Sequence, residues 1–292
     1  MKKINLFSGI AVVALFLGMS FTSCTTTSTP DPYAGKTDPS TIATANLVAY
    51  FPFESATASI SKGDGISFSK VGGAGAFVVG RRGNAYQGST SQAYLQYNLT
   101  ATSALSNLSE FSYSAWIKTP ASTPKNGAAS AFNLNGGDPN VGNFNFIIES
   151  QSNADSLALK PYLRNSTTVW QGQDLWTFKK TNTPDQWIHV VSTYNKTTSV
   201  MTLYVNGVLV NTGIKYGGPT PAVGSQPLLG ALTFVNMTNF YVGAWEPLIT
   251  GVAPSSWMNY YPGMIDELRI YNRALTDTEV KALYAAEVTV IN

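Results

Sequence analysis

The stretch Met201-Thr202-Leu203-Tyr204-Val205-Asn206-Gly207-Val208-Leu209-Val210 decides the fold class of this chain. Asn206-Gly207 stands between two apolar runs and supplies the two positive-φ residues of a type I′ turn, which matches the twist of paired strands. We therefore predict that the two runs pair as an antiparallel hairpin. The run at 187–194 is predicted as the neighbouring strand, and 195–198 as the turn that joins it to the hairpin.

Similar short runs recur outward from this hairpin in both directions. They lie between glycine, serine, threonine and asparagine breakers, at 47–51, 111–118, 144–148, 240–244 and 264–271. Many short strands with turn signals between them, and almost no helical period, are typical of a β-sandwich or barrel. The length of 46–292 is within the range of a single all-β domain, and we predict that this segment is one.

One helix is predicted, close to the C-terminal end. Thr276-Asp277-Thr278-Glu279 has the pattern of a capping box, with Leu275 and Val280 placed as a hydrophobic staple across it. Apolar residues then recur with helical spacing for about three turns, up to about Ala286. We interpret this helix as structural.

The N-terminus has the layout of a secretory signal peptide over residues 1–23. Lys2 and Lys3 precede an apolar run at 4–19, and small residues follow that run. The run is shorter than the roughly 20 residues of a permanent membrane helix. An anchor helix that is never cleaved is the alternative interpretation.

Cys24, the only cysteine of the chain, directly follows this segment and has no partner for an internal disulfide. The residues before it resemble a bacterial lipobox, although Phe21 replaces the more usual small aliphatic residue. The resemblance implies that Cys24 is lipidated and that acyl chains anchor the protein to a membrane. Residues 24–45 contain almost no apolar material, so we predict a flexible tether. We expect an exported outer-membrane lipoprotein that faces either the periplasm or the cell surface.

The charge of the predicted mature chain is balanced. Removal of residues 1–23 removes Lys2 and Lys3 from the 18 basic residues, which leaves 16 against 16 acidic ones. A protein that binds nucleic acid through its surface charge needs a basic surplus. We therefore expect no nucleic-acid partner.

The last predicted strand, at 264–271, has its own pattern of apolar and charged residues. Ile265, Leu268 and Ile270 can point into a core, while Arg269 is near enough to pair with Asp266 or Glu267. A structural ion pair that fixes this strand is one interpretation of the charged residues.

Four segments resemble, in order and spacing, the laminin-G-like jelly roll of the concanavalin A-like lectin and glucanase superfamily. They are 47–54, 80–95, 187–207 and 263–275. The resemblance covers about residues 46–286 and implies an all-β, two-sheet antiparallel jelly-roll sandwich with one short C-terminal helix. Together with the lipobox it is similar to lipoproteins of the Bacteroidetes type. This fold carries many activities and does not determine the function.

The resemblance also implies a structural calcium ion, as an alternative to the ion pair. Relatives often hold a cation between the first and last strands with one carboxylate from each, and Glu54 and Asp266 stand at the matching positions. Calcium takes six to eight oxygen ligands. Gln87 stands where an acid is frequent in the family, which implies a weaker site or none.

The sequence does not show a catalytic constellation. A glycosidase needs two carboxylates that flank the scissile bond, and no Glu-x-Asp-x-Glu pattern occurs. Glu149, Asp155 and Asp174 are isolated in sequence. The only histidine, His189, lies on a predicted central strand, where we expect it to pack. We predict no catalytic residues and a non-enzymatic protein. A glycoside hydrolase or lyase whose acid pair assembles from distant loops remains the alternative.

Aromatic residues beside carboxylates and amides mark the predicted ligand site. Sugar sites combine aromatic faces with polar side chains on loops. Two regions resemble insertions, a polar one at 120–143 and an aromatic one at 216–261. The predicted ligand-binding residues are Trp245, Glu246, Trp257 and Tyr260, with Trp170 and Trp176 from a third stretch. Rings that only cover the core are the alternative interpretation.

These observations predict a cell-envelope lipoprotein with a non-catalytic, lectin-like domain whose partner is a polysaccharide or an oligosaccharide. The alternative from another class is a protein-interaction or adhesion module. That alternative predicts a flat apolar surface patch instead of a lined groove.

Overall fold

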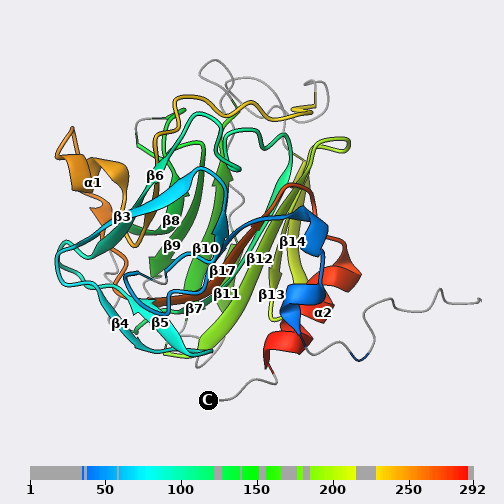
Figure 1. Cartoon of the computed structure of the whole chain (residues 1–292), viewed down its shortest axis with the longest axis horizontal. Helices are drawn as coiled ribbons and strands as arrows, with labels where there is room; N and C mark the ends of the chain where they lie inside the picture. The colour runs from blue at the N-terminus through cyan, green and yellow to red at the C-terminus, as the bar shows by residue number, and fades with distance from the viewer. Residues whose placement is uncertain are drawn as a thin grey trace, which may run out of the picture. The chain divides into compact units, whose positions relative to one another are not determined.

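Two sheets packed face to face form the folded part of the chain (Figure 1). The computed structural model describes residues 35, 38–57, 59–121, 127–138, 140–150, 156–165, 176–179, 185–214 and 228–288. These residues all belong to one compact unit, Tyr33–Asn292. The predicted signal peptide and Cys24 lie outside the described residues.

The first sheet contains the predicted hairpin and the first and last strands of the domain. Its hydrogen-bonded order is β14 (Val208–Ile214), β13 (Val200–Val205), β12 (Trp187–Asn195), β7 (Phe111–Lys118), β17 (Met264–Tyr271), β1 (Leu47–Phe51) and β2 (Lys62–Gly63). A further strand, β5 (Asn84–Gln87), pairs with β17 and with β4 (Ala76–Val79).

The second sheet lies across the core from the first. Its order is β11 (Trp176–Lys179), β10 (Ser156–Leu163), β9 (Phe144–Ser150), β8 (Ala128–Leu134), β15 (Asn239–Val242), β6 (Tyr94–Leu99) and β3 (Ile66–Gly72). The short strand β16 (Met258–Asn259) runs parallel to β8, whereas the strands within the two main orders pair antiparallel. The predicted two-sheet antiparallel sandwich is therefore confirmed.

The hairpin that decided the fold class forms as predicted. β13 pairs antiparallel with β14, and β12 pairs with β13 and β7. Asn206 and Gly207 have φ values of 51° and 75°, the left-handed values that a type I′ turn requires at both central positions. The Asn195 side chain accepts hydrogen bonds from the backbone N–H groups of Thr197 and Thr198, which fixes the preceding turn.

The closing strand β17 contains a bulge that explains its sequence pattern. Ile265, Leu268 and Ile270 all lie in the main core, although a regular strand would place Ile265 and Leu268 on opposite faces. The pairing with β7 shifts register between Asp266 and Arg269, and Glu267 has a φ of 53°. The extra residue of the bulge changes the direction of the Asp266 and Glu267 side chains, while the apolar residues on both sides of it still face the core.

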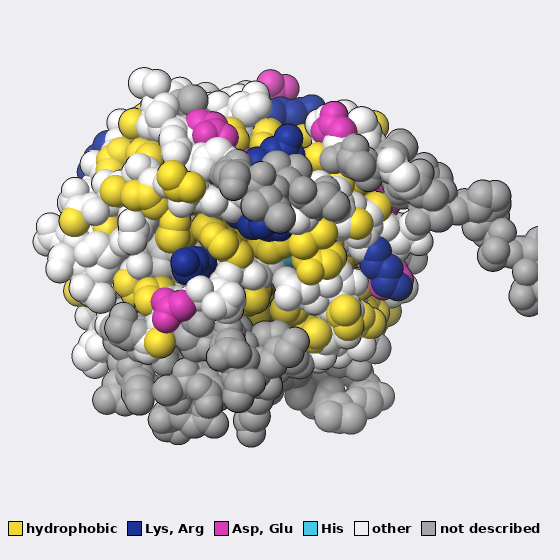
Figure 2. Space-filling model, turned by 90° about the horizontal axis from the view of Figure 1, so that it is seen from below, with side chains coloured by type: hydrophobic (Ala, Val, Ile, Leu, Met, Phe, Trp, Pro, Cys, Tyr) yellow, Lys and Arg dark blue, Asp and Glu magenta, His cyan; other side chains and the backbone are white. Residues whose placement is uncertain are grey.

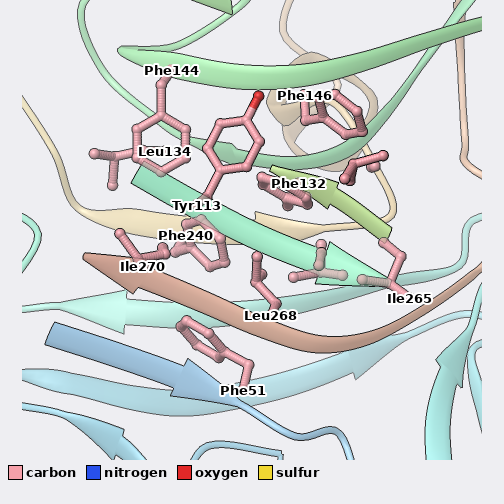
Figure 3. Packing of buried hydrophobic residues seen from close by; sticks show 14 of the residues in the cluster. Phe51, Tyr113, Phe132, Leu134, Phe144, Phe146, Phe240, Ile265, Leu268 and Ile270 are labelled. Carbon is pink, nitrogen blue, oxygen red and sulfur yellow. The ribbon is translucent and has the colours of Figure 1, made fainter. Parts of the chain in front are cut away.

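Aromatic rings fill the space between the sheets (Figure 3). Tyr113 of β7 stands edge-on to Phe132 of β8, with ring centroids 4.9 Å apart. Phe51 of β1 stacks on Phe240 of β15 at 5.1 Å, which joins the first sheet to the second. Truncation of such a buried ring to alanine typically costs about 3–5 kcal/mol. The core thus fixes the distance and orientation of the two sheets.

The predicted helix is α2 (Asp277–Val288), which lies against the outer face of the first sheet. Its capping box is present: the Thr276 N–H donates to the Glu279 carboxylate at 2.9 Å, and the Glu279 N–H donates to the Thr276 hydroxyl at 3.2 Å. Among the described residues, no helix is long and apolar enough to cross a membrane.

Residues in front of the first strand also belong to the folded part. They form two short 3₁₀ helices, Pro39–Thr41 and Thr44–Asn46. Ile42 is buried in the same hydrophobic cluster as Val280 and Leu283 of α2. Because Ile42 has this apolar partner surface, the predicted tether at 24–45 overlaps folded residues at its C-terminal end.

Candidate functional site

The outer face of the second sheet carries the candidate site. Side chains of β9 alternate, so Phe146 and Ile148 lie in the main core while Ile147 points outward. Ile147 belongs to a separate hydrophobic cluster with Tyr162 of β10 and Trp245. The segment after β15 therefore packs on the outside of the sheet and builds a second layer there.

A pocket of about 440 Å³ opens in this layer, and we call it the tryptophan pocket. Nearly buried side chains line its inner part: Ala128, Ile147, Tyr162 and Trp245. More accessible residues complete the lining: Asp138, Asn140, Val141, Glu149 and Trp257. This combination of apolar and polar groups is typical of small-molecule sites.

The two tryptophans of the pocket have different roles. Trp245 is fully buried, and its indole N–H donates to the backbone carbonyl of Ala128 at 2.9 Å. Trp257 is 41% exposed and meets Trp245 edge to face, with ring centroids 5.1 Å apart. Trp245 thus supports the pocket from behind, and Trp257 supplies the ring that a ligand can reach.

Two carboxylates face the same pocket, and each is tied to a cation. Asp138 pairs with Arg164 and also accepts hydrogen bonds from the backbone N–H groups of Asn140 and Val141, which shapes the β8–β9 loop. Glu149 of β9 pairs with Lys160 on the adjacent strand. These ion pairs fix the position of hydrogen-bond acceptors on two sides of the pocket.

Buried asparagines of β8 and its following loop hold the pocket segment in place. Asn133 donates to the backbone carbonyl of Ala244 at 2.7 Å, directly before Trp245. Asn135 lies two residues further on and donates to the Glu246 carboxylate at 3.0 Å. The side-chain oxygen of Asn135 accepts hydrogen bonds from the backbone N–H groups of Thr238 and Asn239. The sequence interpretation did not assign these asparagines, because their partners are distant in sequence.

The other predicted ligand residues lie at different depths. Glu246 begins the short helix α1 (Glu246–Thr250) and lies beside the tryptophan pocket without lining it. The Tyr260 hydroxyl donates to the carbonyl of Leu248 at 2.9 Å, which ties β16 to α1. Trp170 lies outside the described residues, and of Trp176 only its place in β11 is described.

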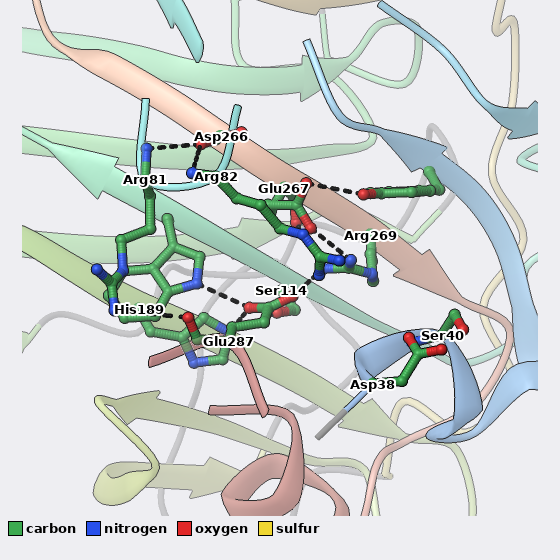
Figure 4. Close-up of polar contacts among 12 residues, drawn as sticks. Asp38, Ser40, Arg81, Arg82, Ser114, His189, Asp266, Glu267, Arg269 and Glu287 are labelled. Atoms are coloured by element: carbon green, nitrogen blue, oxygen red, sulfur yellow. Dashed lines mark hydrogen bonds and ion pairs between the residues drawn. The ribbon is translucent and has the colours of Figure 1, made fainter. Parts of the chain in front are cut away.

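The predicted metal ligands Glu54 and Asp266 both hold the turn before β5. Figure 4 shows the contacts of Asp266 with Arg81 and Arg82. Asp266 accepts the N–H groups of Arg81 and Arg82 at 2.8 and 2.9 Å, and Glu54 accepts that of Asn84 at 2.9 Å. Burial raises the pKa of Asp266 to about 8.

Calcium at this position is not confirmed. The described residues contain no group of three or more Asp, Glu, His or Cys side chains that could hold a metal. Because oxygens of Glu54 and Asp266 already accept backbone N–H groups, these residues fit the six to eight ligands of calcium poorly. The predicted ion pair of the last strand does form, between Arg269 and Glu267 at 2.5 Å.

His189 lies in a cluster of buried polar side chains beneath α2 (Figure 4). Its Nε2 is 2.7 Å from the Ser114 hydroxyl and 3.5 Å from Glu287 of α2. A serine–histidine–acid triad uses both ring nitrogens, one for each partner, whereas here both contacts converge on one nitrogen. All three side chains are buried. Burial lowers the pKa of His189 to about 3, so the ring is neutral, and the cluster has a structural role.

Comparison with known families accounts for this arrangement of strands. A sequence model of the concanavalin A-like lectin/glucanases superfamily matches residues 88–244 and 231–281, which together span more than half of the chain. The chain belongs to this superfamily. The predicted laminin-G-like resemblance is thereby confirmed at the level of the domain. A comparison with curated proteins finds no match.

Solved structures with a similar fold include binding domains of botulinum neurotoxins. The binding domain of botulinum neurotoxin serotype D is 13% identical with a TM-score of 0.54, over 84% of this chain and 52% of that chain. The receptor binding domain of a C/D mosaic serotype is 14% identical with a TM-score of 0.53, over 82% and 51%. This chain thus spans about half the length of the neurotoxin domains, and the likeness shows the fold alone.

A third similar structure is domain 4 of AbnA, a GH43 extracellular arabinanase from Geobacillus stearothermophilus, in complex with arabinotriose. It is 21% identical with a TM-score of 0.48, over 82% of this chain and 98% of that domain.

Proposed function

We propose that this protein is a non-catalytic glycan-binding module that holds a sugar ring against Trp257 in the tryptophan pocket. The exposed ring of Trp257 beside oriented carboxylates carries this proposal. Sugar rings present apolar C–H faces and polar hydroxyls, so an aromatic surface with nearby acceptors matches both. The neurotoxin domains that share the fold are binding domains, so the fold can carry the class of function that we propose here.

Asp138 and Glu149 have a positioning role in this proposal. A glycosidase also places two carboxylates in one pocket, so these two residues are the pair that a hydrolase would use. Each is engaged with a cation, however, and Asp138 also supports the loop through two backbone N–H groups. We assign both to the orientation of ligand hydroxyls.

A glycan array of plant, host and microbial polysaccharides tests the proposed binding. We expect signal from the wild-type protein and from Val79→Ala, which changes an exposed apolar residue outside the pocket. Trp257→Ala loses the signal, and Trp257→Phe retains part of it because a ring remains. If Trp257→Ala binds glycans as well as the wild type does, the tryptophan pocket is not the glycan-binding site.

The protein-interaction alternative has an observation of its own. On the face shown in Figure 2, hydrophobic side chains of the described residues gather in a band across the middle. Apolar patches of this kind mark protein contacts. On that face, Lys and Arg side chains stand singly or beside acidic ones. This alternative is favoured if no glycan on the array binds and crosslinking yields a complex of defined stoichiometry with another protein.

We further propose that lipidated Cys24 anchors the domain to the cell envelope, on either side of the outer membrane. Only the sequence supports this part, through the signal-like segment and the single cysteine. Mass spectrometry of the mature protein should show a diacylglyceryl cysteine at its N-terminus. Cys24→Ser should move the protein from the membrane to the soluble fraction.

A further inference from the structure

A second hollow adjoins the tryptophan pocket. It has a volume of about 460 Å³ and lies against α1 and the residues that follow this helix, and we call it the helix hollow. Asn140 lines both the tryptophan pocket and the helix hollow. Because the two hollows share this wall residue, they are neighbours on the protein surface, and we call them together the groove.

The helix hollow repeats the chemistry of the tryptophan pocket with other residues. Val252 is 71% exposed and provides an apolar surface, as Trp257 does in the first hollow. Glu246 provides the carboxylate, and the Asn135 amide holds its side chain in place. Each hollow therefore pairs an accessible apolar group, a ring in one and an aliphatic side chain in the other, with an oriented acceptor, and such a pair can contact both the C–H groups and the hydroxyls of a sugar unit.

The backbone at the rim of the helix hollow contains one strained residue. Gly251 ends α1 in the left-handed region at a φ of 73°, which a glycine adopts without strain. Ala253, on the other side of Val252, has a φ of 47°, which is unfavourable for a residue with a Cβ. Strained residues of this kind cluster at binding sites.

The charged side chains of the groove have one sign. Among the described residues that line the two hollows, every charged side chain is a carboxylate: Asp138, Glu149 and Glu246. Arg164 and Lys160, the partners of the first two, do not line either hollow. Because Asp138 and Glu149 are each paired with a cation, the uncompensated negative charge among the described lining residues is that of Glu246 in the helix hollow. This charge disfavours anionic ligands there and contributes to specificity.

From the paired hollows and their charge we infer that the ligand is an oligosaccharide chain of neutral or amino sugars that occupies both hollows, with adjacent units on either side of Asn140. This inference rests on the proposed glycan binding at Trp257. It excludes two ligand classes, namely a single terminal sugar held by Trp257 alone and polyanionic glycans such as polyuronates.

Isothermal titration with oligosaccharides of one to six units tests this inference. The probes are cello-, xylo- and manno-oligosaccharides as neutral ladders, chitosan oligosaccharides as the cationic ladder and oligogalacturonates as the anionic one. We expect binding to at least one neutral or cationic ladder, with affinity that rises about tenfold or more from one unit to four. We expect no binding of oligogalacturonates.

Two variants separate the hollows. Glu246→Gln and Val252→Asp should each weaken binding of the tetrasaccharide about tenfold and leave binding of the single sugar unchanged. Trp257→Ala should weaken both, and Val79→Ala should change neither. Circular dichroism melting checks that each variant is folded.

The results of these experiments distinguish a failure of the two-hollow inference from a failure of the proposed glycan binding at Trp257. If Trp257→Ala abolishes binding but affinity does not rise with length, or only oligogalacturonates bind, the two-hollow inference is wrong and glycan binding stands. If no ladder binds, or Trp257→Ala binds like the wild type, glycan binding at this pocket is itself wrong.

Discussion

Trp245 and Trp257 meet edge to face, with ring planes at 88°, yet Trp245 is fully buried while Trp257 is 41% exposed. One ring therefore belongs to the outer hydrophobic layer, and its neighbour belongs to the ligand surface. The same substitution at the two positions should thus have different effects.

Trp245→Ala should destabilise the protein by about 3–5 kcal/mol, because it leaves a cavity and removes the hydrogen bond to Ala128. Trp257→Ala should change stability by about 1 kcal/mol or less and should abolish glycan binding. Urea unfolding measures the first effect, and titration with the glycan measures the second. Similar stability losses in both variants would contradict this division of roles.

Asn135→Ala should weaken both the fold and the helix hollow. The substitution leaves the N–H groups of Thr238 and Asn239 without the side-chain acceptor and Glu246 without the amide donor. A buried group without a partner costs about 1–3 kcal/mol, so urea unfolding should show a loss of that size. Asn135→Asp keeps the acceptor but places a carboxylate beside Glu246, so it should restore part of the stability and none of the tetrasaccharide affinity.

The buried pair His189 and Glu287 predicts how stability depends on pH. Burial raises the pKa of Glu287 to about 7, so its contribution is complete below the unfolded value near 4.5 and is lost as pH rises through 7. Burial lowers the pKa of His189 to about 3, so its contribution is lost as pH falls below about 6.5. The effects of Glu287 and His189 oppose each other between pH 4.5 and 6.5. Burial also raises the pKa of Asp266, to about 8, and among the described residues no further group offsets this effect, so we expect stability to fall as pH rises through this range.

Glu287→Gln should reduce the loss of stability between pH 6.5 and 8 by about 1 kcal/mol. Asp266 acts in the same direction, with its raised pKa of about 8, so part of the slope should remain. In this variant the opposite effects of His189 and Asp266 should leave stability nearly constant between pH 4.5 and 6.5. Urea titrations at pH 5.5, 6.5 and 8 provide the comparison, and an unchanged alkaline slope would contradict the assignment to Glu287.

Calcium should have no effect on the melting temperature, because Glu54 and Asp266 already bind backbone N–H groups around residues 81–84. Differential scanning calorimetry with calcium chloride and with a chelator checks this expectation. A rise of several degrees with calcium, lost in Asp266→Asn, would establish the cation site that the family resemblance implies.

Local sequence patterns predicted the parts of the fold that local chemistry determines. The Asn206-Gly207 turn and the capping box at Thr276 both form, since each depends on residues adjacent in sequence. Only one feature of the sequence indicates the bulge at Glu267. The core residues Ile265 and Leu268 are three positions apart, whereas residues on one face of a regular strand are separated by multiples of two. Only a shifted strand register brings both residues into the core.

The candidate site was predictable in part. Trp257 stood out as one of several aromatic residues in the insertion at 216–261. Its position depends on Trp245, which is held by a hydrogen bond to Ala128 of β8, a residue distant in sequence. The roles of Asp138 and Glu149 arise from cations on β10 and just after it. An isolated acid in the β8–β9 loop and another on β9 carry no local signal, so their common pocket appears only once β8, β9 and β10 are placed side by side.

The pairing of β1 with β17 determines when the protein can complete its fold. Leu47 lies opposite Tyr271, more than 200 residues later in the chain, and β17 stands between β1 and β7 in the first sheet. A chain that emerges N-terminus first must therefore hold β1 without its neighbour until nearly the whole polypeptide is available. Contacts this distant in sequence slow folding and leave strand edges open to aggregation in the meantime. The late arrival of one central strand thus makes its insertion between β1 and β7 one of the last steps in the assembly of the domain.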